Sequence, residues 1–177
     1  MKRDYIEFQE RSIAKGYLIT FRCYGTWLHG DERGSIDRNH NVYRSPKIPG
    51  NSNWQKFNEA ALIHDPVKLD ARRRRSVGNS IEQTCVRRGW HLFAMNVRTN
   101  HVHAVVTIGE KKPANALIAL KANATRQLRE DGLWLYEHTP WAEKGSKRRL
   151  WNEQSIWEAC NYVNNRQGKD LPDYDWW

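Results

Sequence analysis

The stretch HLFAMNVRTNHVHAVVTI, residues 91–108, decides the fold. It holds two alternating apolar segments, 91–98 and 101–108, and such alternation is typical of half-buried β-strands. The two residues between the segments, Thr99 and Asn100, favour a tight hairpin turn. We therefore predict an antiparallel pair of strands over this stretch.

Three features lie before this hairpin. Residues 16–25 are aromatic, β-branched and apolar between two glycines, and they predict a strand. Residues of about 30–53 show no periodicity and include several Gly and Pro. We expect a long inserted loop there, of the kind that is functional or disordered in a compact domain. Residues 67–88 predict a helix, because apolar residues recur there every four positions on one face.

Three further elements follow the hairpin. Residues 113–130 predict a helix with a proline in its first turn. Residues 146–151, SKRRLW, predict a short basic strand. Asn152 is a typical N-cap for a last helix over 153–166, and the tail of about 168–177 is expected to be irregular.

The predicted order is strand, helix, strand, strand, helix, strand, helix. Its first six elements match the split βαβ arrangement, a ferredoxin-like α+β core in which an antiparallel sheet carries helices on one face. The last helix is then appended to this core. A chain of 177 residues fits one domain better than two, so we expect a single domain over 1–177.

The charge of the chain is a statement about its partners. The net charge is +9, from 29 Lys and Arg against 20 Asp and Glu. A basic chain gains affinity for nucleic acid by releasing counterions, although simple solubility explains the excess equally well. The candidate nucleic-acid contacts are Arg72, Arg73, Arg74, Arg75, Lys121, Arg126, Lys147, Arg148 and Arg149. Trp27 and the loop of about 30–53 are further candidates, and a solvated or core role is an equal alternative for each.

Other features of the composition predict a protein of the reduced cytoplasm. Three cysteines that are far apart, Cys23, Cys85 and Cys160, form neither a metal-binding pair nor a disulfide framework. The N-terminus is too polar for a signal peptide, and no apolar run reaches the length of a membrane span, so no membrane partner is expected.

Two histidines on one predicted strand are the first candidates for chemistry. His101 and His103 are two positions apart, so their side chains project to the same face of the strand and could grip a divalent metal. Two ordinary polar residues on a half-exposed strand are the alternative. The next alternate position is Val105, which argues against a histidine-triad hydrolase. The sequence also lacks HExxH and a Gly-rich phosphate loop.

A tyrosine on the last predicted helix is the second candidate. Tyr162 stands beside the apolar stripe of that helix, where it could simply pack with a solvated hydroxyl. As a nucleophile, a phenol with a pKa near 10 is weak unless its target phosphate is polarised, and a metal beside it would do this. Tyr24 and Tyr136 are alternative nucleophiles.

Two motifs carry a resemblance to a known family. The stretches RTNHVH, 98–103, and ACNYV, 159–163, resemble the Asn-His-hydrophobic-His and tyrosine-helix motifs of small tyrosine transposases of the HUH superfamily. This group comprises insertion-sequence transposases and REP-associated tyrosine transposases. Residues 121–128 and 149–151 are similar to the helix and final strand between these motifs. The similarity covers most of the chain from residue 16 to residue 168.

The resemblance implies a reaction and its residues. Members bind Mg²⁺ or Mn²⁺ through two histidines and a third polar ligand, although two imidazoles alone would favour zinc or another transition metal. Their tyrosine attacks single-stranded DNA at hairpin-containing sites, giving a 5′-phosphotyrosine link and a free 3′-hydroxyl, and rejoining needs no ATP. Carried onto this chain, His101 and His103 are metal ligands and Tyr162 is the nucleophile.

The third ligand departs from the family pattern. The family often places Gln one helical turn after the tyrosine, where this chain has Arg166, and Gln167 follows. In a regular helix, a five-residue step turns Gln167 away from Tyr162. We keep Gln167 as the expected ligand if the helix ends early, with Glu158 as a substitute.

Two other functions stay open at this point. The chain could be a non-catalytic, domesticated protein that binds DNA hairpins, or an HUH nickase that starts replication or plasmid transfer. A homodimer is also possible, in which the tyrosine helix serves its own histidines or those of a second subunit.

Overall fold

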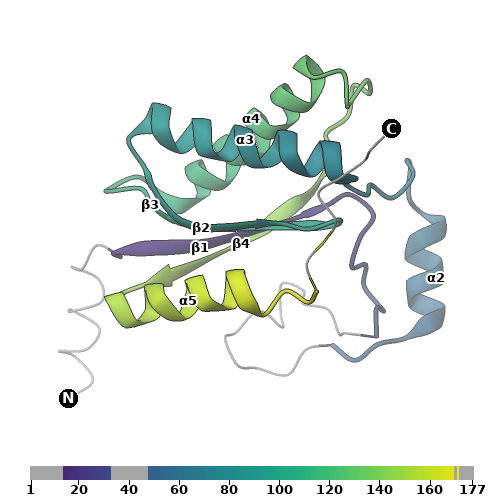
Figure 1. The fold of residues 1–177 in the computed structure, drawn as a ribbon. Coiled ribbons are helices and arrows are strands. Elements are labelled where there is room, and N and C mark those ends of the chain that lie inside the picture. Colours follow the sequence, from purple (N-terminus) through teal and green to yellow (C-terminus); the bar gives the residue numbers. More distant parts are fainter. Residues whose placement is uncertain (1–13, 33–47, 170, 172–177) are drawn as a thin grey trace.

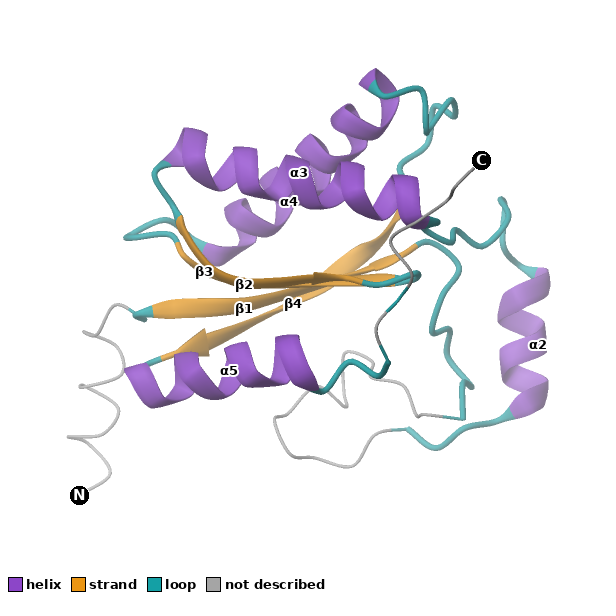
Figure 2. Ribbon diagram, viewed as in Figure 1, coloured by secondary structure: helices purple, strands orange, loops and turns teal. Residues whose placement is uncertain are grey.

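The computed structural model describes residues 14–32, 48–169 and 171, and shows a sheet between two layers of helices (Figures 1 and 2). Its elements are, in order, β1 (Gly16–Cys23), α2 (Ser52–Ala60), α3 (Ala71–Arg88), β2 (His91–Val97), β3 (His101–Thr107), α4 (Pro113–Glu130), β4 (Trp141–Leu150) and α5 (Glu153–Asn165). No helix in these residues is long and apolar enough to cross a membrane.

The sheet has the strand order β2-β3-β1-β4, and every neighbouring pair is antiparallel. Helices α3 and α4 cover one face, and α5 lies along the opposite face (Figure 1). This arrangement confirms the α+β, ferredoxin-like core with an appended C-terminal helix. It places β1 and β3 side by side at the centre of the sheet, although the two strands are far apart in the sequence.

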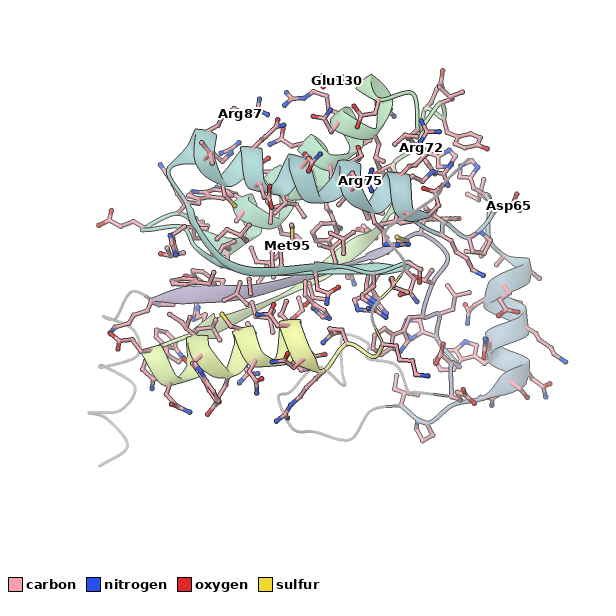
Figure 3. All side chains as sticks on the ribbon, in the orientation of Figure 1. Asp65, Arg72, Arg75, Arg87, Met95 and Glu130 are labelled. Carbon is pink, nitrogen blue, oxygen red and sulfur yellow. The ribbon has the colours of Figure 1, made fainter. Side chains whose placement is uncertain are left out.

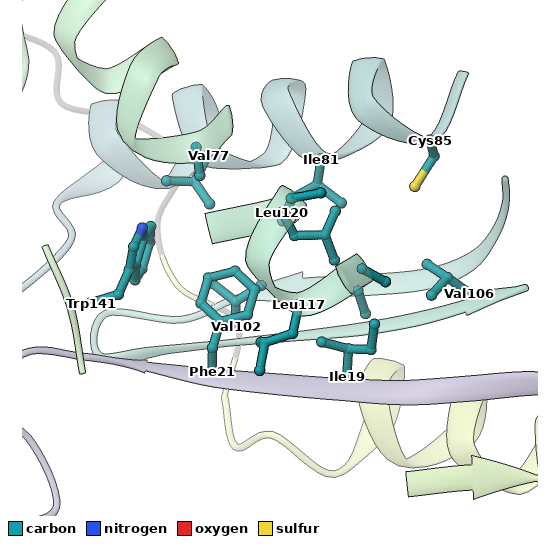
Figure 4. Close-up of a cluster of buried hydrophobic side chains, with 14 of the residues drawn as sticks. Ile19, Phe21, Val77, Ile81, Cys85, Val102, Val106, Leu117, Leu120 and Trp141 are labelled. Atoms are coloured by element: carbon teal, nitrogen blue, oxygen red, sulfur yellow. The ribbon is translucent and has the colours of Figure 1, made fainter. Parts of the chain in front are cut away.

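The main core lies between the sheet and the pair α3 and α4 (Figure 4). Alternate residues of the central strands point into it, among them Ile19, Phe21 and Val102, which are fully buried. The Trp141 ring meets the Phe21 ring edge to face, with 4.9 Å between the ring centroids. Its indole N–H donates to the carbonyl of Lys121, so the start of β4 is fixed to α4.

Replacing Phe21 by alanine is expected to lower the free energy of unfolding by about 3–5 kcal/mol, because it opens a cavity in this core. Urea unfolding followed by circular dichroism measures the change. Phe57→Ala is the matched control, since the Phe57 side chain on α2 is 71% exposed and its loss should cost less than about 0.5 kcal/mol. Equal effects of the two substitutions would contradict this description of the core.

A second, smaller core lies on the other face of the sheet. Leu18, Val105 and Leu150 pack against Ala159 and Val163 of α5. Asn152 caps this helix by accepting a hydrogen bond from the backbone N–H of Ser155, as its sequence predicted. The apolar stripe of α5 therefore covers part of this face.

Several predicted boundaries were wrong, for local reasons. β1 ends at Cys23 instead of 25, because Gly25 adopts a left-handed conformation with φ 71°. α3 begins at Ala71 instead of 67, because Asp70 caps it. Residues 67–70 form no helix, and the backbone N–H groups of Val67 and Leu69 donate to the carbonyls of Tyr24 and Thr99.

Other predictions differ from the structure by an element or by a few residues. α2 was not predicted, because it is short and none of its residues is buried. Its first two residues fall inside the predicted loop of about 30–53, of which 33–47 lie outside the described residues. β4 begins at Trp141 instead of 146. Four elements end one residue earlier than predicted: β2 at 97, β3 at 107, β4 at 150 and α5 at 165. The predicted 113–130 helix is confirmed as α4.

Candidate active site

The face of the sheet that carries α5 changes from apolar to polar along the strands. Residues that pair across strands point to the same side of a sheet. The row under α5 is apolar, with Ala94, Val105 and Leu18 in register. One step of two residues further, the row is polar on all four strands: Asn96, His103, Thr20 and Ser146. A polar patch therefore lies beside the C-terminal end of α5.

His101 and His103 form the centre of this patch. Their ring centroids are 4.8 Å apart, and the ring planes cross at 72°. His103 is buried and His101 is half-buried, while Val102 between them points into the main core. The alternation predicted from the sequence is confirmed, since both imidazoles lie on one face.

Each imidazole is oriented through its Nδ1 atom. Nδ1 of His101 lies 2.8 Å from Oδ1 of Asn100, and Nδ1 of His103 lies 2.7 Å from the hydroxyl of Thr20. A carboxamide oxygen only accepts, so the tautomer of His101 that bonds to it carries its proton on Nδ1. Thr20 can accept in the same way from His103. In this tautomer of both rings the Nε2 lone pairs are available, as in histidines that bind metals.

The ionisation of His103 suits a cation. Burial, together with the neighbouring His101, lowers the pKa of His103 to about 4, and a hydrogen bond with Gln167 opposes this shift. His103 is therefore neutral at pH 7. A neutral imidazole is the form that coordinates a metal.

Gln167 reaches the histidines because α5 ends early. The helix stops at Asn165, and Arg166 leaves it with φ −122° and ψ 23°. The side-chain N–H of Gln167 then donates back to the carbonyl of Tyr162, at 3.1 Å. Its Oε1 faces Nε2 of His101 at 3.4 Å. Because the helix ends at Asn165, the Gln167 side chain lies beside His101, which a continued helix would not allow.

The spacing of these atoms fits a metal site. With Nδ1 protonated, Nε2 of His101 and Oε1 of Gln167 are both electron-pair donors. Two ligands about 2.1 Å from one ion are about 3.0–3.4 Å apart, which matches the observed 3.4 Å. Within the described ranges, no group of three or more His, Cys, Asp and Glu could hold a metal ion, so Glu158 does not join the pair. Glu158 instead accepts a hydrogen bond from Gln154 on the surface of α5.

Tyr162 lies against the same pair. Its ring centroid is 5.4 Å from that of His103, and the side chain is 40% exposed. Asn96 donates to the carbonyl of Val163 at 2.9 Å, and Arg98 donates to that of Lys169 at 3.0 Å, so the end of α5 is fixed over its own chain's histidines.

The two alternative tyrosines lie elsewhere. The hydroxyl of Tyr24 accepts a hydrogen bond from the backbone of Ile63. Tyr136 lies in the loop after α4, where its ring contacts Trp134 and His138. That loop is bonded to α3, on the opposite face of the sheet from α5.

Thr20 and Arg22 are site residues that the sequence reasoning missed. Both lie on β1, where they alternate with the core residues Ile19 and Phe21, and Arg22 is paired directly with His101. Polar residues at alternate positions of an otherwise apolar strand were the available signal. The pairing of β1 with β3, which brings them to the histidines, was not visible in the sequence.

The predicted nucleic-acid contacts do not form one surface. Figure 3 shows Arg72 and Arg75 on α3, on the side of the sheet opposite α5. Arg73 donates to the carbonyls of Leu133 and Lys68, and Arg74 donates to that of Leu69. Arg73 and Arg74 therefore hold the ends of nearby loops.

The remaining basic candidates lie on α4 and β4. The Lys121 ammonium donates to three carbonyls at the start of β4, and Arg126 pairs with Glu130. Lys147, Arg148 and Arg149 are exposed on β4, which is an edge strand. Of these three, Arg148 is on the face of the histidines, because its partner is Leu18. Contact of the nine basic residues with DNA stays a prediction.

The family model described as "Transposase IS200 like" matches residues 66–165, more than half of the chain. No curated protein matches the chain. Two solved structures are similar at 11% sequence identity. One is a REP-associated tyrosine transposase bound to a REP hairpin (TM-score 0.49). The match includes 85% of this chain and 66% of that protein. The other is a putative transposase from Deinococcus radiodurans R1 (TM-score 0.46). The match includes 89% of this chain and 95% of that protein.

Proposed function

The chain belongs to the family of IS200-like transposases, and we propose that it cleaves and rejoins single-stranded DNA with Tyr162 as the nucleophile. One observation carries this proposal: two imidazoles, a carboxamide oxygen and a tyrosine ring meet on one polar patch. The patch lies beside the C-terminal end of α5, and the tyrosine is exposed enough for a strand to reach it.

His101, His103 and Gln167 would hold Mg²⁺ or Mn²⁺ through Nε2, Nε2 and Oε1. Such an ion neutralises charge on a phosphate, and phosphate and water oxygens would complete its shell. The chain's own residues prepare this site. Asn100 and Thr20 fix the two rings, and burial keeps His103 neutral.

In the cleavage step, the Tyr162 oxygen forms a bond to the phosphorus as the bond from phosphorus to the 3′ oxygen breaks. The phenol proton is lost to solvent, and the 3′ oxygen takes up a proton. The 5′ end of the downstream strand is then linked to the protein. Rejoining reverses these changes with a 3′-hydroxyl as the attacking group, so the reaction needs no nucleotide cofactor.

The DNA would bind to exposed basic residues on both faces of a single domain, 1–177. We propose that exposed residues such as Arg72, Arg75, Lys147 and Arg148 contribute phosphate contacts to a hairpin-bearing strand. One chain supplies both the histidines and the tyrosine, so a homodimer is not needed to complete the site. In a bacterial cell, such a protein would work on the DNA of the nucleoid.

A covalent adduct tests this proposal. Oligonucleotides copied from both strands of the DNA that flanks the gene, with the hairpins found there, are labelled at the 3′ end and incubated with protein and Mn²⁺. We expect a labelled protein band on a denaturing gel, absent when EDTA replaces Mn²⁺, and no protein band from the same strands labelled at the 5′ end. Binding of these strands without metal-dependent cleavage would contradict the proposal and support a non-catalytic hairpin-binding protein.

Replacing Thr20 by valine should weaken Mn²⁺ binding about 10- to 100-fold, because His103 loses the partner that fixes its ring. Isothermal titration calorimetry on the protein without DNA measures the affinity. Thr107→Val is the matched control, since Thr107 lies at the far end of β3 and pairs with His91. Equal Mn²⁺ affinity of the Thr20 variant and the control would show that this hydroxyl does not support the site.

A further inference from the structure

The loop that follows β1 is tied to the histidine strand. The backbone N–H of Cys23 donates to the carbonyl of Asn100, at 2.8 Å. The hydroxyl of Thr26 donates to the carbonyl of Cys23 at 2.7 Å, and lies 3.4 Å from that of Asn100. The residue before His101 therefore anchors this loop, which leaves the sheet at the same end as the C-terminal end of α5 (Figure 1).

Arg22 connects this loop to the polar patch. It lies opposite His101 in the register of β1 and β3, on the same face of the sheet. Its guanidinium donates to the carbonyl of Trp27 at 3.1 Å and stands 5.4 Å from the centroid of the Trp27 ring. Arg22 thus links Trp27 to His101.

The backbone of Trp27 is strained. Its φ is 56°, and it is the one residue other than glycine with a positive φ in the part of the chain that the structure describes. For an ordinary side chain this conformation costs about 1–2 kcal/mol, and a glycine would adopt it freely. The turn itself therefore gives no reason for an indole. Strained residues of this kind gather at functional sites, and this one is half-exposed beside the candidate active site.

We propose that Trp27 and Arg22 form a nucleotide subsite, in which the base beside the scissile phosphate stacks on the indole and the guanidinium binds a phosphate of the same strand. Stacking on an aromatic ring suits any base, and a basic group beside it tracks the backbone. A guanidinium has five N–H donors, so Arg22 can hold the loop and bind a phosphate together. The inference rests on the proposed function for its choice of strand.

The test measures binding alone, in the Tyr162→Phe protein, with a fluorescent oligothymidylate of about 12 nucleotides, which forms no hairpin. Trp27→Gly should weaken binding about 5- to 150-fold, the loss expected for one stacked base. It should not lower the melting temperature, because glycine relieves the strain. Trp157→Ala is the control, because Trp157 is an exposed tryptophan of α5, and this variant should bind normally. Alanine is used there because a glycine would destabilise the helix.

A second readout separates the two residues. Arg22→Gln should make the slope of log affinity against log salt concentration shallower by about 0.7, the value for one phosphate contact to a single strand. Trp27→Gly should leave this slope unchanged.

Three outcomes would overturn the subsite. These are unchanged affinity of the Trp27 variant, a loss no larger than that of Trp157→Ala, and a melting temperature that falls together with the affinity. Because the probe needs neither cleavage nor a hairpin, failure of the adduct experiment would not produce these outcomes. A normal adduct with any of them would remove the subsite alone.

Discussion

Replacement of Tyr162 by phenylalanine abolishes the covalent protein–DNA adduct and leaves DNA affinity nearly unchanged: this is the expected result with the largest effect. The substitution removes one oxygen atom, which is the proposed nucleophile, and keeps the ring that packs against His103. The side chain is exposed on α5, so the fold should not change. A denaturing gel with the end-labelled strand measures the adduct, and fluorescence anisotropy measures the affinity.

Two other tyrosines provide the controls for this substitution. Tyr24→Phe and Tyr136→Phe remove the same atom from residues that lie away from the histidines, and both variants should form the adduct at the normal rate. An adduct that survives in the Tyr162 variant and disappears in either control would move the nucleophile to that residue.

His101→Ala should lower the rate of metal-dependent cleavage by about 10³-fold or more, because stabilisation of charge by a bound ion is worth several kcal/mol. His101 is the better test of the pair. It is half-buried, whereas loss of the buried His103 would also open a cavity and leave the Thr20 hydroxyl without its partner. Cleavage under single-turnover conditions gives the rate, and calorimetry with Mn²⁺ gives the affinity of the metal.

Binding of DNA should survive this substitution, because a net charge of +9 remains to attract phosphate. His91→Ala is the matched control, since His91 is exposed at the start of β2 and far along the sheet from the polar patch. Cleavage at the normal rate by His101→Ala, with Mn²⁺ still bound, would exclude His101 as a ligand.

Local patterns predicted most of the fold. The alternation of 91–108 predicted a hairpin with both histidines on one face, and Asn152 marked the start of α5. The pattern failed where burial gives no periodicity. α2 is nine residues long and buries none of them, so it does not contribute to the apolar core pattern. The start of α3 was misplaced because Val67 and Leu69 are buried as extended chain before the Asp70 cap.

The candidate site was harder to predict than the fold, because it depends on long-range pairing and on a helix end. Thr20 and Arg22 meet the histidines only through the register of β1 with β3. Gln167 reaches them because α5 ends at Asn165 and Arg166 leaves the helix, which the residue count from Tyr162 could not reveal. Candidate site residues can be read from the sequence, but strand register and the end of α5 determine which of them lie together.

Mass spectrometry of the trapped adduct tests the central claim most directly. Trypsin cuts after Arg149 and Arg166, and the peptide between them, 150–166, contains Tyr162 as its one tyrosine. After nuclease digestion of the DNA, the account predicts that this peptide gains the mass of a 5′-phosphonucleotide, and that fragmentation places it on Tyr162. A nucleotide found on another peptide, or on another residue of 150–166, would contradict the account.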